Sequence, residues 1–143
     1  LARHGTPRTP ADLRHHLAVG YASPSTGRRE DWEWVEQGEV RSLQLRSRVT
    51  VNGAEAYIAC CLAGLGLIQL PAYDAAAHLA AGELVAVLPD HRAQPMPMTL
   101  LYPHRRHLAQ RVQVLIDWLE ELLRRAVQPG AAVRLPCAIA DSA

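Results

Sequence analysis

Phenylalanine and lysine are absent from this chain of 143 residues. Its 15 basic residues are therefore all arginines, which are spread from Arg3 to Arg134, and the formal net charge is only +1. Proteins that bind nucleic acid through an extended arm concentrate their basic residues in one segment. This distribution excludes such an arm, and we expect most of the arginines to be solvated surface charges.

Cysteine is also scarce, with three residues, two of which are the neighbours Cys60 and Cys61. An odd number without zinc-type spacing predicts neither a disulfide framework nor a metal site, and it favours a reducing compartment. The sequence further lacks an apolar run of the ~20 residues that a membrane-spanning helix needs. Its first ten residues contain no apolar stretch typical of a signal peptide. We therefore predict a cytoplasmic protein without a membrane partner.

Hydrophobic residues make up 49% of the chain and charged residues 20%, which is enough apolar material for one sizeable core. This composition predicts a single domain or a piece of one. The sequence opens on Leu1 without an initiator methionine. We therefore expect that the coding sequence continues upstream of Leu1.

The first half of the chain contains signals for two helices and several strands. Thr9 followed by Pro10 is typical of a helix start, because proline at the first helical position loses no hydrogen bond. Asn52 is a suitable N-cap for a helix from Gly53 to Ala63, where apolar residues recur every three or four positions. The strands predicted from β-type residues are Leu17 to Ala22 and two or three short ones between Trp32 and Val51.

The second half alternates strands with helices, which predicts a layered α/β fold. Residues 127–143 are rich in small residues without a period, and we predict that they form a disordered tail. The predicted elements are a strand Leu67 to Leu70, a helix Ala75 to Ala81 capped by Asp74, strands Glu83 to Leu88 and Met98 to Tyr102, and an amphipathic helix Leu108 to Arg125.

Three pairs of residues have some likeness to metal or catalytic sites, and the sequence argues against each. The adjacent pair His15–His16 diverges on a helix or a strand and cannot easily share a metal. The pair His104 and His107 flanks two arginines, whose charge disfavours a divalent cation. Asp74 and His78 have the spacing of one helical face, but no nucleophile lies near them in the sequence. We therefore predict no metal site and no catalytic residue.

The segment from Gly64 to Gly66 follows the predicted helix and precedes a strand. A dinucleotide fingerprint needs a third glycine and opens a helix after a strand, so this segment is interpreted as a helix stop. Cys60 and Cys61 lie in the same apolar helix, where thiols pack as small hydrophobes. No cofactor is predicted.

Several distinctive stretches nevertheless occur in a characteristic order. They are Leu1 to Pro10 followed by Ala11-Asp12-Leu13, then Trp32 to Trp34, Val51-Asn52, the segment AGLGLIQLP from Ala63 to Pro71, GELV at Gly82 to Val85, LLYP at Leu100 to Pro103 and IDWL at Ile116 to Leu119. In this order they resemble the C-terminal part of the effector-binding domain of LysR-type transcriptional regulators, over residues 1–125.

The resemblance implies a periplasmic-binding-protein-like (type 2) fold, in which two α/β subdomains close on a small ligand. Residues 1–126 would form a truncated effector domain. Residues 11–92 would be one nearly complete subdomain, and residues 96–126 would be the strand and helix that return to the other. The resemblance further implies homo-oligomers, with DNA bound only through a winged helix-turn-helix that has no counterpart in this chain.

Family members line the ligand cleft from the strand end before a helix and from the crossover strands. Carried over, this implies effector contacts from Thr50, Val51 and Asn52 on one wall and from Thr99 near the hinge. The implied function is the sensing of a small-molecule effector, which shifts a conformational equilibrium and drives no reaction. Two alternatives are a fragment of a solute-binding protein for transport and a small enzyme that uses Asp74 and His78.

Overall fold

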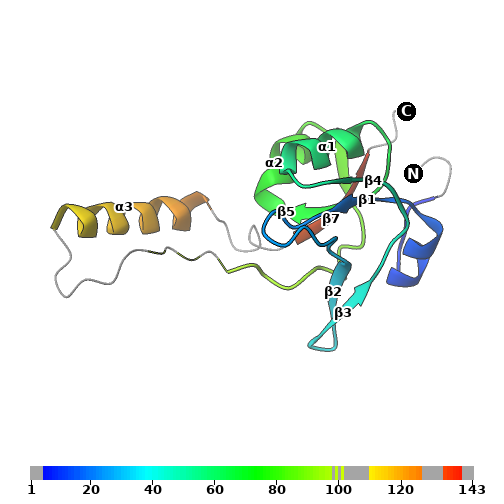
Figure 1. Cartoon of the computed structure of the whole chain (residues 1–143), viewed down its shortest axis with the longest axis horizontal. Helices are drawn as coiled ribbons and strands as arrows, with labels where there is room; N and C mark the ends of the chain where they lie inside the picture. Colours follow the sequence, from blue (N-terminus) through cyan, green and yellow to red (C-terminus); the bar gives the residue numbers. More distant parts are fainter. Residues whose placement is uncertain (1–4, 98, 100, 102–109, 127–133, 140–143) are drawn as a thin grey trace.

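The fold is described by a computed structural model, which covers residues 5–97, 99, 101, 110–126 and 134–139 (Figure 1). Its helices and strands confirm an α/β class. In chain order they are the short 3-10 helix η1 (Pro10–His15), β1 (Ala18–Tyr21), β2 (Trp32–Glu36), β3 (Glu39–Leu43), β4 (Ser47–Val51), α1 (Ala54–Leu62), β5 (Ile68–Pro71), α2 (Ala72–Ala80), β6 (Leu84–Ala86), α3 (Gln110–Ala126) and β7 (Arg134–Ile139).

The strands form three hydrogen-bonded groups. β1 pairs with β4 in parallel, β2 pairs with β3 as an antiparallel hairpin, and β7 lies antiparallel between β5 and β6. An isolated parallel bridge between Ala18 and Leu67 brings β1 beside the start of β5. Strands β4, β1, β5, β7 and β6 therefore follow one another across the molecule, and α1 and α2 lie together over one face of them (Figure 1).

Two clusters of apolar side chains hold these layers together. One gathers on the helix side and joins residues of β1 and β5 to α1 and α2, including Val19, Tyr57, Cys61 and Ile68. The other joins Ala18 and Leu67 to Leu13, Trp32, Leu45 and Val87. Ala18 and Val19 are consecutive residues of β1, whose side chains point to opposite faces of a strand. The strand is therefore covered on both sides.

The β2–β3 hairpin turns within two residues. Gln37 and Gly38 both have positive φ, at 53° and 82°, which is the backbone geometry of a type I′ turn. This turn matches the twist of the strands it joins, and the pairing runs without interruption from Trp32 opposite Leu43 to Glu36 opposite Glu39.

The predicted helix starts need correction at two of three places. Thr9 is the N-cap residue of η1, as predicted. Asn52 does not cap α1, because the N-cap position belongs to Gly53. Asp74 does not cap α2, which begins at Ala72 directly after Pro71 and so contains Asp74 in its first turn. Proline's fixed φ suits the residue that precedes a helix, and this local signal outweighs the carboxylate three positions later.

The prediction of a disordered tail over residues 127–143 is wrong for Arg134–Ile139, which form β7. Pro136 lies within this strand although proline cannot donate a hydrogen bond to a ladder. In the structure Pro136 lies opposite Gln69 in the middle of the sheet. Pairing on both sides, with β5 and with β6, supplies the hydrogen bonds that the isolated sequence does not predict.

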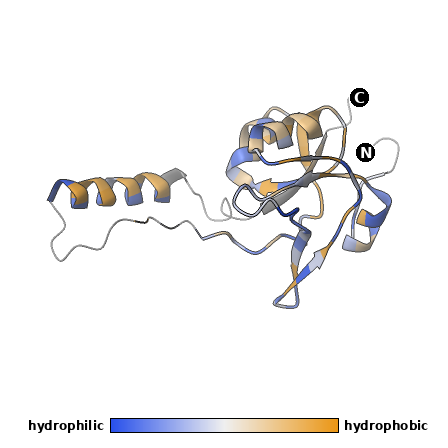
Figure 2. Ribbon diagram, in the orientation of Figure 1, coloured by the Kyte–Doolittle hydropathy of each residue, from blue (hydrophilic) through white to orange (hydrophobic). Residues whose placement is uncertain are grey.

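The predicted strand from Met98 to Tyr102 falls partly outside the described residues. Thr99 and Leu101 are described, and both are exposed and outside any strand. Helix α3 stands away from the layered body, and hydrophobic and hydrophilic residues alternate along it (Figure 2). Among the described residues, no helix combines the length and apolar character that crossing a membrane requires.

Candidate functional site

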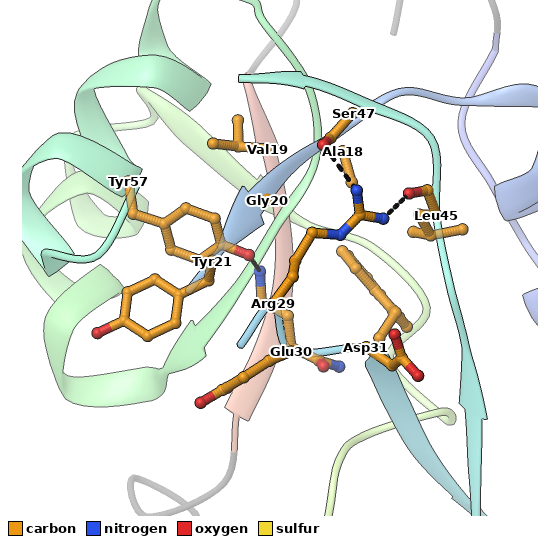
Figure 3. Close-up of a pocket in the computed structure, with 12 residues that line it drawn as sticks. Ala18, Val19, Gly20, Tyr21, Arg29, Glu30, Asp31, Leu45, Ser47 and Tyr57 are labelled. Carbon is orange, nitrogen blue, oxygen red and sulfur yellow. Dashed lines mark hydrogen bonds between the residues drawn. The ribbon is translucent and has the colours of Figure 1, made fainter. Parts of the chain in front are cut away.

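A pocket opens beside β1, where five separate parts of the chain meet (Figure 3). The strand supplies one wall, the segment that leads into β2 supplies a second, and the start of β4 supplies a third. Its lining residues are Ala18, Val19, Gly20, Tyr21, Arg29, Glu30, Asp31, Trp32, Leu45, Ser47, Tyr57 and Gln69.

Gly20 is the residue that lets polar groups converge here. A Cβ atom at this position would lie 2.5 Å from the Thr50 hydroxyl oxygen, 3.1 Å from the Ser47 hydroxyl oxygen and 3.2 Å from Cδ of Arg29. Glycine inside a strand often marks a site of close approach by another group, and here three side chains approach one backbone position. The strand register agrees, since Gly20 lies opposite Thr50 on β4.

Arg29 reaches across β1 toward β4. Its Nη1 donates a hydrogen bond to the Ser47 hydroxyl at 3.1 Å, and its Nη2 donates to the carbonyl oxygen of Leu45. The backbone at its base is tied to the end of β1, where Glu30 N donates to the carbonyl of Tyr21 at 2.8 Å. Figure 3 shows the guanidinium between Ser47 and Leu45. The positive charge is therefore held in one place at the pocket wall.

Trp32 adds a buried hydrogen-bond donor to the same pocket. Its side chain is only 5% exposed, and its indole Nε1 has no hydrogen-bond partner in the described structure. A buried N–H without a partner costs free energy, about 1–3 kcal/mol in typical cases. The indole N–H of Trp32 therefore lacks the hydrogen bond that a buried donor usually has.

Gln69 fixes the hairpin against the sheet beside the pocket. Its side-chain Oε1 accepts from the backbone N–H of Glu33 at 3.0 Å, and its Nε2 donates to the carbonyl of Glu33 at 2.7 Å. The amide thus pairs with β2 as a neighbouring strand would. Its backbone N–H donates to the Tyr57 hydroxyl at 3.1 Å, and the ring of Tyr57 lies 5.2 Å from that of Tyr21.

The four residues predicted to bind an effector lie close to this pocket or outside it. Thr50 is exposed on β4, and its hydroxyl lies beside Gly20, as do the side chains of Ser47 and Arg29. Thr50 does not itself line the pocket. Val51 ends β4, and Asn52 follows it as an exposed residue. Thr99 is exposed in an irregular segment and lines no part of the pocket.

Gly20, Arg29, Trp32 and Ser47 were not predicted from the sequence to lie together. Gly20 carried a signal, because a glycine inside a predicted buried strand suggests close approach of another group. Arg29 carried none, since it is one of 15 arginines in a chain where most were expected to be solvated. Only the tertiary structure brings Arg29 to the start of β4.

The structure describes two of the other pairs considered from the sequence, Asp74 with His78 and His15 with His16. His78 and Asp74 lie on α2, but the Nδ1 atom of His78 hydrogen bonds with Glu83 Oε2 at 2.6 Å. Burial, together with the charge of Glu55, raises the pKa of Asp74 above its usual value. The described part of the chain contains no group of three or more histidines, cysteines or carboxylates placed to hold a metal ion. His104 and His107 lie outside it.

Comparison with known proteins adds a family match. Residues 1–124 match the model of the LysR substrate binding domain. An uncharacterized HTH-type transcriptional regulator of Escherichia coli, YhjC, is 36% identical over 124 residues, which are 87% of this chain and 42% of that protein. The probable HTH-type transcriptional regulator LtrA of Klebsiella pneumoniae is 30% identical over 124 residues, 85% of this chain and 40% of LtrA.

A third relative is the HTH-type transcriptional regulator PtxR of Pseudomonas aeruginosa, which is 33% identical over 118 residues, 81% of this chain and 36% of PtxR. In all three cases the matched region is most of this chain but less than half of the relative. The similarity therefore concerns one part of each regulator.

Proposed function

This chain belongs to the LysR substrate-binding domain family, and we propose that it is the effector-sensing part of a bacterial LysR-type transcriptional regulator. The observation that carries the proposal is the family match over residues 1–124. In this role the chain binds a small molecule, and binding favours one conformation of the longer regulator over another. The pocket beside β1 is the place in the described structure that offers convergent polar groups to such a molecule.

The two alternatives have less support. The three relatives described above are named as transcriptional regulators, which favours regulation over solute transport. The same names favour a binding protein over an enzyme. An enzyme based on Asp74 and His78 would also need to release His78 from Glu83.

The proposed arrangement of subdomains in the longer regulator is the one that the family implies. Residues 11–92 form one subdomain and residues 96–126 return to a second one, so that the effector binds in a cleft between them, and the pocket beside β1 is the part of that cleft which the first subdomain contributes. Thr50, Val51, Asn52 and Thr99 contribute contacts to that cleft. The regulator acts in the cytoplasm as a homo-oligomer and binds DNA through another part of the longer protein.

Binding can be tested with the 143-residue chain and a panel of small metabolites that spans carboxylates, amines, sugars and neutral aromatics. We expect at least one class to raise the melting temperature in a saturable manner, because a ligand that binds only the folded state stabilises it. Gly20→Ala should weaken that binding by about tenfold, since the added methyl group displaces the Thr50 and Ser47 hydroxyls.

Gly53→Ala is the matched control, because its added Cβ meets nothing closer than 3.9 Å. It should bind as the wild type does. The regulatory role is tested in cells whose genome encodes this chain. There, the compound that binds should change the transcript levels of a defined set of genes. Absence of saturable binding by every class, or unchanged transcripts in the presence of the binding compound, would contradict the proposed function.

A further inference from the structure

We propose that two copies of this chain dimerise by exchanging β7. In the dimer, β7 of each copy fills the β5–β6 slot of its partner, which is the space between β5 and β6 that β7 occupies. The proposal goes beyond effector sensing, because it concerns an interaction between copies of the chain. Exchange of an identical element is a low-cost route to a dimer, since the element finds the same contacts in the partner as in its own chain.

The β5–β6 slot is a gap that the rest of the sheet leaves open. Among the described strands, β5 and β6 pair with β7 and not with each other. Both lie within residues 1–124, which match the LysR substrate binding domain, whereas β7 lies beyond them. The family match therefore does not prescribe which chain supplies the strand that fills this slot.

The contacts of β7 come from the strand itself. Cys137 is fully buried and belongs to the apolar cluster on the helix side, and Ala138 is 3% exposed and belongs to the cluster on the other side. Backbone pairing with β5 and with β6 holds the strand along both edges. The Cys61 thiol also donates to the carbonyl of Cys137. A partner's β7 would make all of these contacts in the same register.

Pro136 stands where a missing N–H costs little. The N–H of Gln69 donates to the Tyr57 hydroxyl at 3.1 Å, and hydrogen-bonded and non-hydrogen-bonded pairs alternate along an antiparallel ladder. Gln69 and Pro136 therefore form a non-hydrogen-bonded pair, and the Pro136 nitrogen faces the side of β6. On that side the pairing ends at Ala86 opposite Cys137. Pro136 thus removes no hydrogen bond to either neighbouring strand.

Helix α3 precedes β7 and carries an uncovered stripe that suits a helix of the same sequence. It stands away from the layered body (Figure 1), and Leu115 and Leu122 are 53% and 46% exposed. Apolar residues that alternate at spacings of three and four are the pattern by which like helices pair along their length. The residues with this spacing are Val112, Leu115, Leu119 and Leu122. A chain that donates β7 brings α3 with it, so exchange gives each stripe a partner of its own kind.

A disulfide between β6 and β7 distinguishes exchange from other modes of association. Ala86 and Cys137 lie directly opposite each other in a non-hydrogen-bonded pair, where Cα atoms are about 4.5 Å apart and a disulfide can form. Ala86→Cys therefore adds a thiol beside Cys137 of whichever chain supplies β7. Cys60→Ser accompanies this change in every sample, because Cys60 is the half-buried one of the three cysteines.

The variant chain is unfolded in urea with a reductant, refolded at a low and at a high protein concentration, and then oxidised with diamide. On a non-reducing gel, an exchanged β7 links two chains, whereas an unexchanged β7 is linked to its own chain. We expect the fraction of covalent dimer to rise at least about fivefold from the low to the high concentration, because association follows mass action. Adding Leu115→Gln and Leu122→Gln should lower this fraction.

Ala86→Cys combined with Cys137→Ala is the matched control, and it should give no covalent dimer. Thermal unfolding establishes that each variant is folded. Disulfides within single chains only, at both concentrations, would overturn the proposal. The same gel from a sample that sediments as a dimer would also overturn it, since the copies would then associate without exchange. A covalent dimer that is equally abundant in the control, or that is unchanged by the two glutamines, would contradict the proposed arrangement.

Discussion

Two glycines show how single residues shape this molecule. Neither Gly20 nor Gly66 has a positive φ. Glycine is needed at both positions because the missing Cβ atom leaves space for a neighbouring group, and not because of its conformational freedom. At Gly20 the space is filled by side chains that can move. At Gly66 it is filled by the backbone of Leu17 and Ala18, which cannot. The same substitution should therefore affect ligand binding at Gly20 and folding at Gly66.

Gly66→Ala is expected to lower the free energy of unfolding by about 3 kcal/mol, the upper end of the usual range for overpacking. An added Cβ would lie 2.7 Å from the Leu17 carbonyl oxygen and from the Ala18 carbonyl carbon. The backbone N–H of Leu67 donates to the carbonyl of Leu17 at 2.8 Å, so a displacement here also disturbs the contact between β1 and β5. Chemical denaturation monitored by circular dichroism measures the change.

The control for this prediction is Gly53→Ala, which should cost less than about 1 kcal/mol because it changes only an N-cap preference. Equal stabilities of Gly66→Ala and the wild type would mean that the backbone adjusts at this contact.

Among the elements, β7 was not predicted from the sequence, yet it is the central strand of its three-stranded sheet. It lies between β5 and β6, with Cys137 opposite Ile68 on one side and Ala86 on the other. Cys137 is fully buried, and burial raises the pKa of its thiol to about 11. Beside it, the Sγ atom of Cys61 donates a weak hydrogen bond to the carbonyl of Cys137 at 3.9 Å. The thiols therefore act as packing groups between α1 and the sheet.

The raised pKa of Cys137 predicts a loss of stability in alkaline solution. Below pH 9 the thiol keeps its proton in both the folded and the unfolded chain, so the group adds no pH dependence. Between pH 9 and about 11 the unfolded chain loses the proton first, and the free energy of unfolding falls as the pH rises. Above about 11 the effect levels off. The shift of two pKa units corresponds to at most about 2.7 kcal/mol.

Comparison with Cys137→Ala isolates this contribution from other groups that titrate in the same range. The variant should be less stable at pH 8 because of the small cavity. Its stability should also fall less steeply than that of the wild type between pH 9 and 11, as measured by urea unfolding at several pH values. Parallel curves for the two proteins over this range would contradict a buried, protonated Cys137.

At the scale of the whole molecule, the distribution of apolar surface is uneven. The layered body buries its apolar residues in two clusters, one on the helix side of the strands and one on the other side. Helix α3 leaves several large apolar side chains in solvent, with Leu115 53% exposed and Trp118 58% exposed. Leu122 continues the same stripe, since positions three and four apart lie on one side of a helix. Stripes of this kind promote association.

We therefore expect this chain to self-associate as its concentration rises. The double variant Leu115→Gln and Leu122→Gln should shift the equilibrium toward the monomer, as measured by sedimentation velocity over a hundredfold range of concentration. Gln113→Ala is a suitable control, because Gln113 is an exposed polar residue of the same helix that bonds only to Asp117 in the described structure. A wild-type chain that stays monomeric throughout would contradict the prediction.

The sequence alone predicted the α/β class, the N-cap at Thr9, the helix that contains Cys60 and Cys61, and the family. These predictions succeeded because helix periods, glycine stops and ordered motifs are local signals, which neighbouring residues carry in full. The positions of Asn52 and Asp74 relative to their helices were wrong by a few residues, because Gly53 and Pro71 occupy the N-cap positions. Competing local signals of similar strength leave such boundaries uncertain.

Contacts between distant residues decided the rest. Arg134–Ile139 form a strand although Pro136 argues against one, because β5 and β6 offer hydrogen-bonding partners on both sides. Arg29 differs from the other arginines only through its reach over Gly20 to Ser47 and Leu45. The sequence by itself thus determined which segments become helices or strands over most of the chain. The tertiary structure determined which of them meet, because the free energy of these contacts depends on residues that only folding brings together.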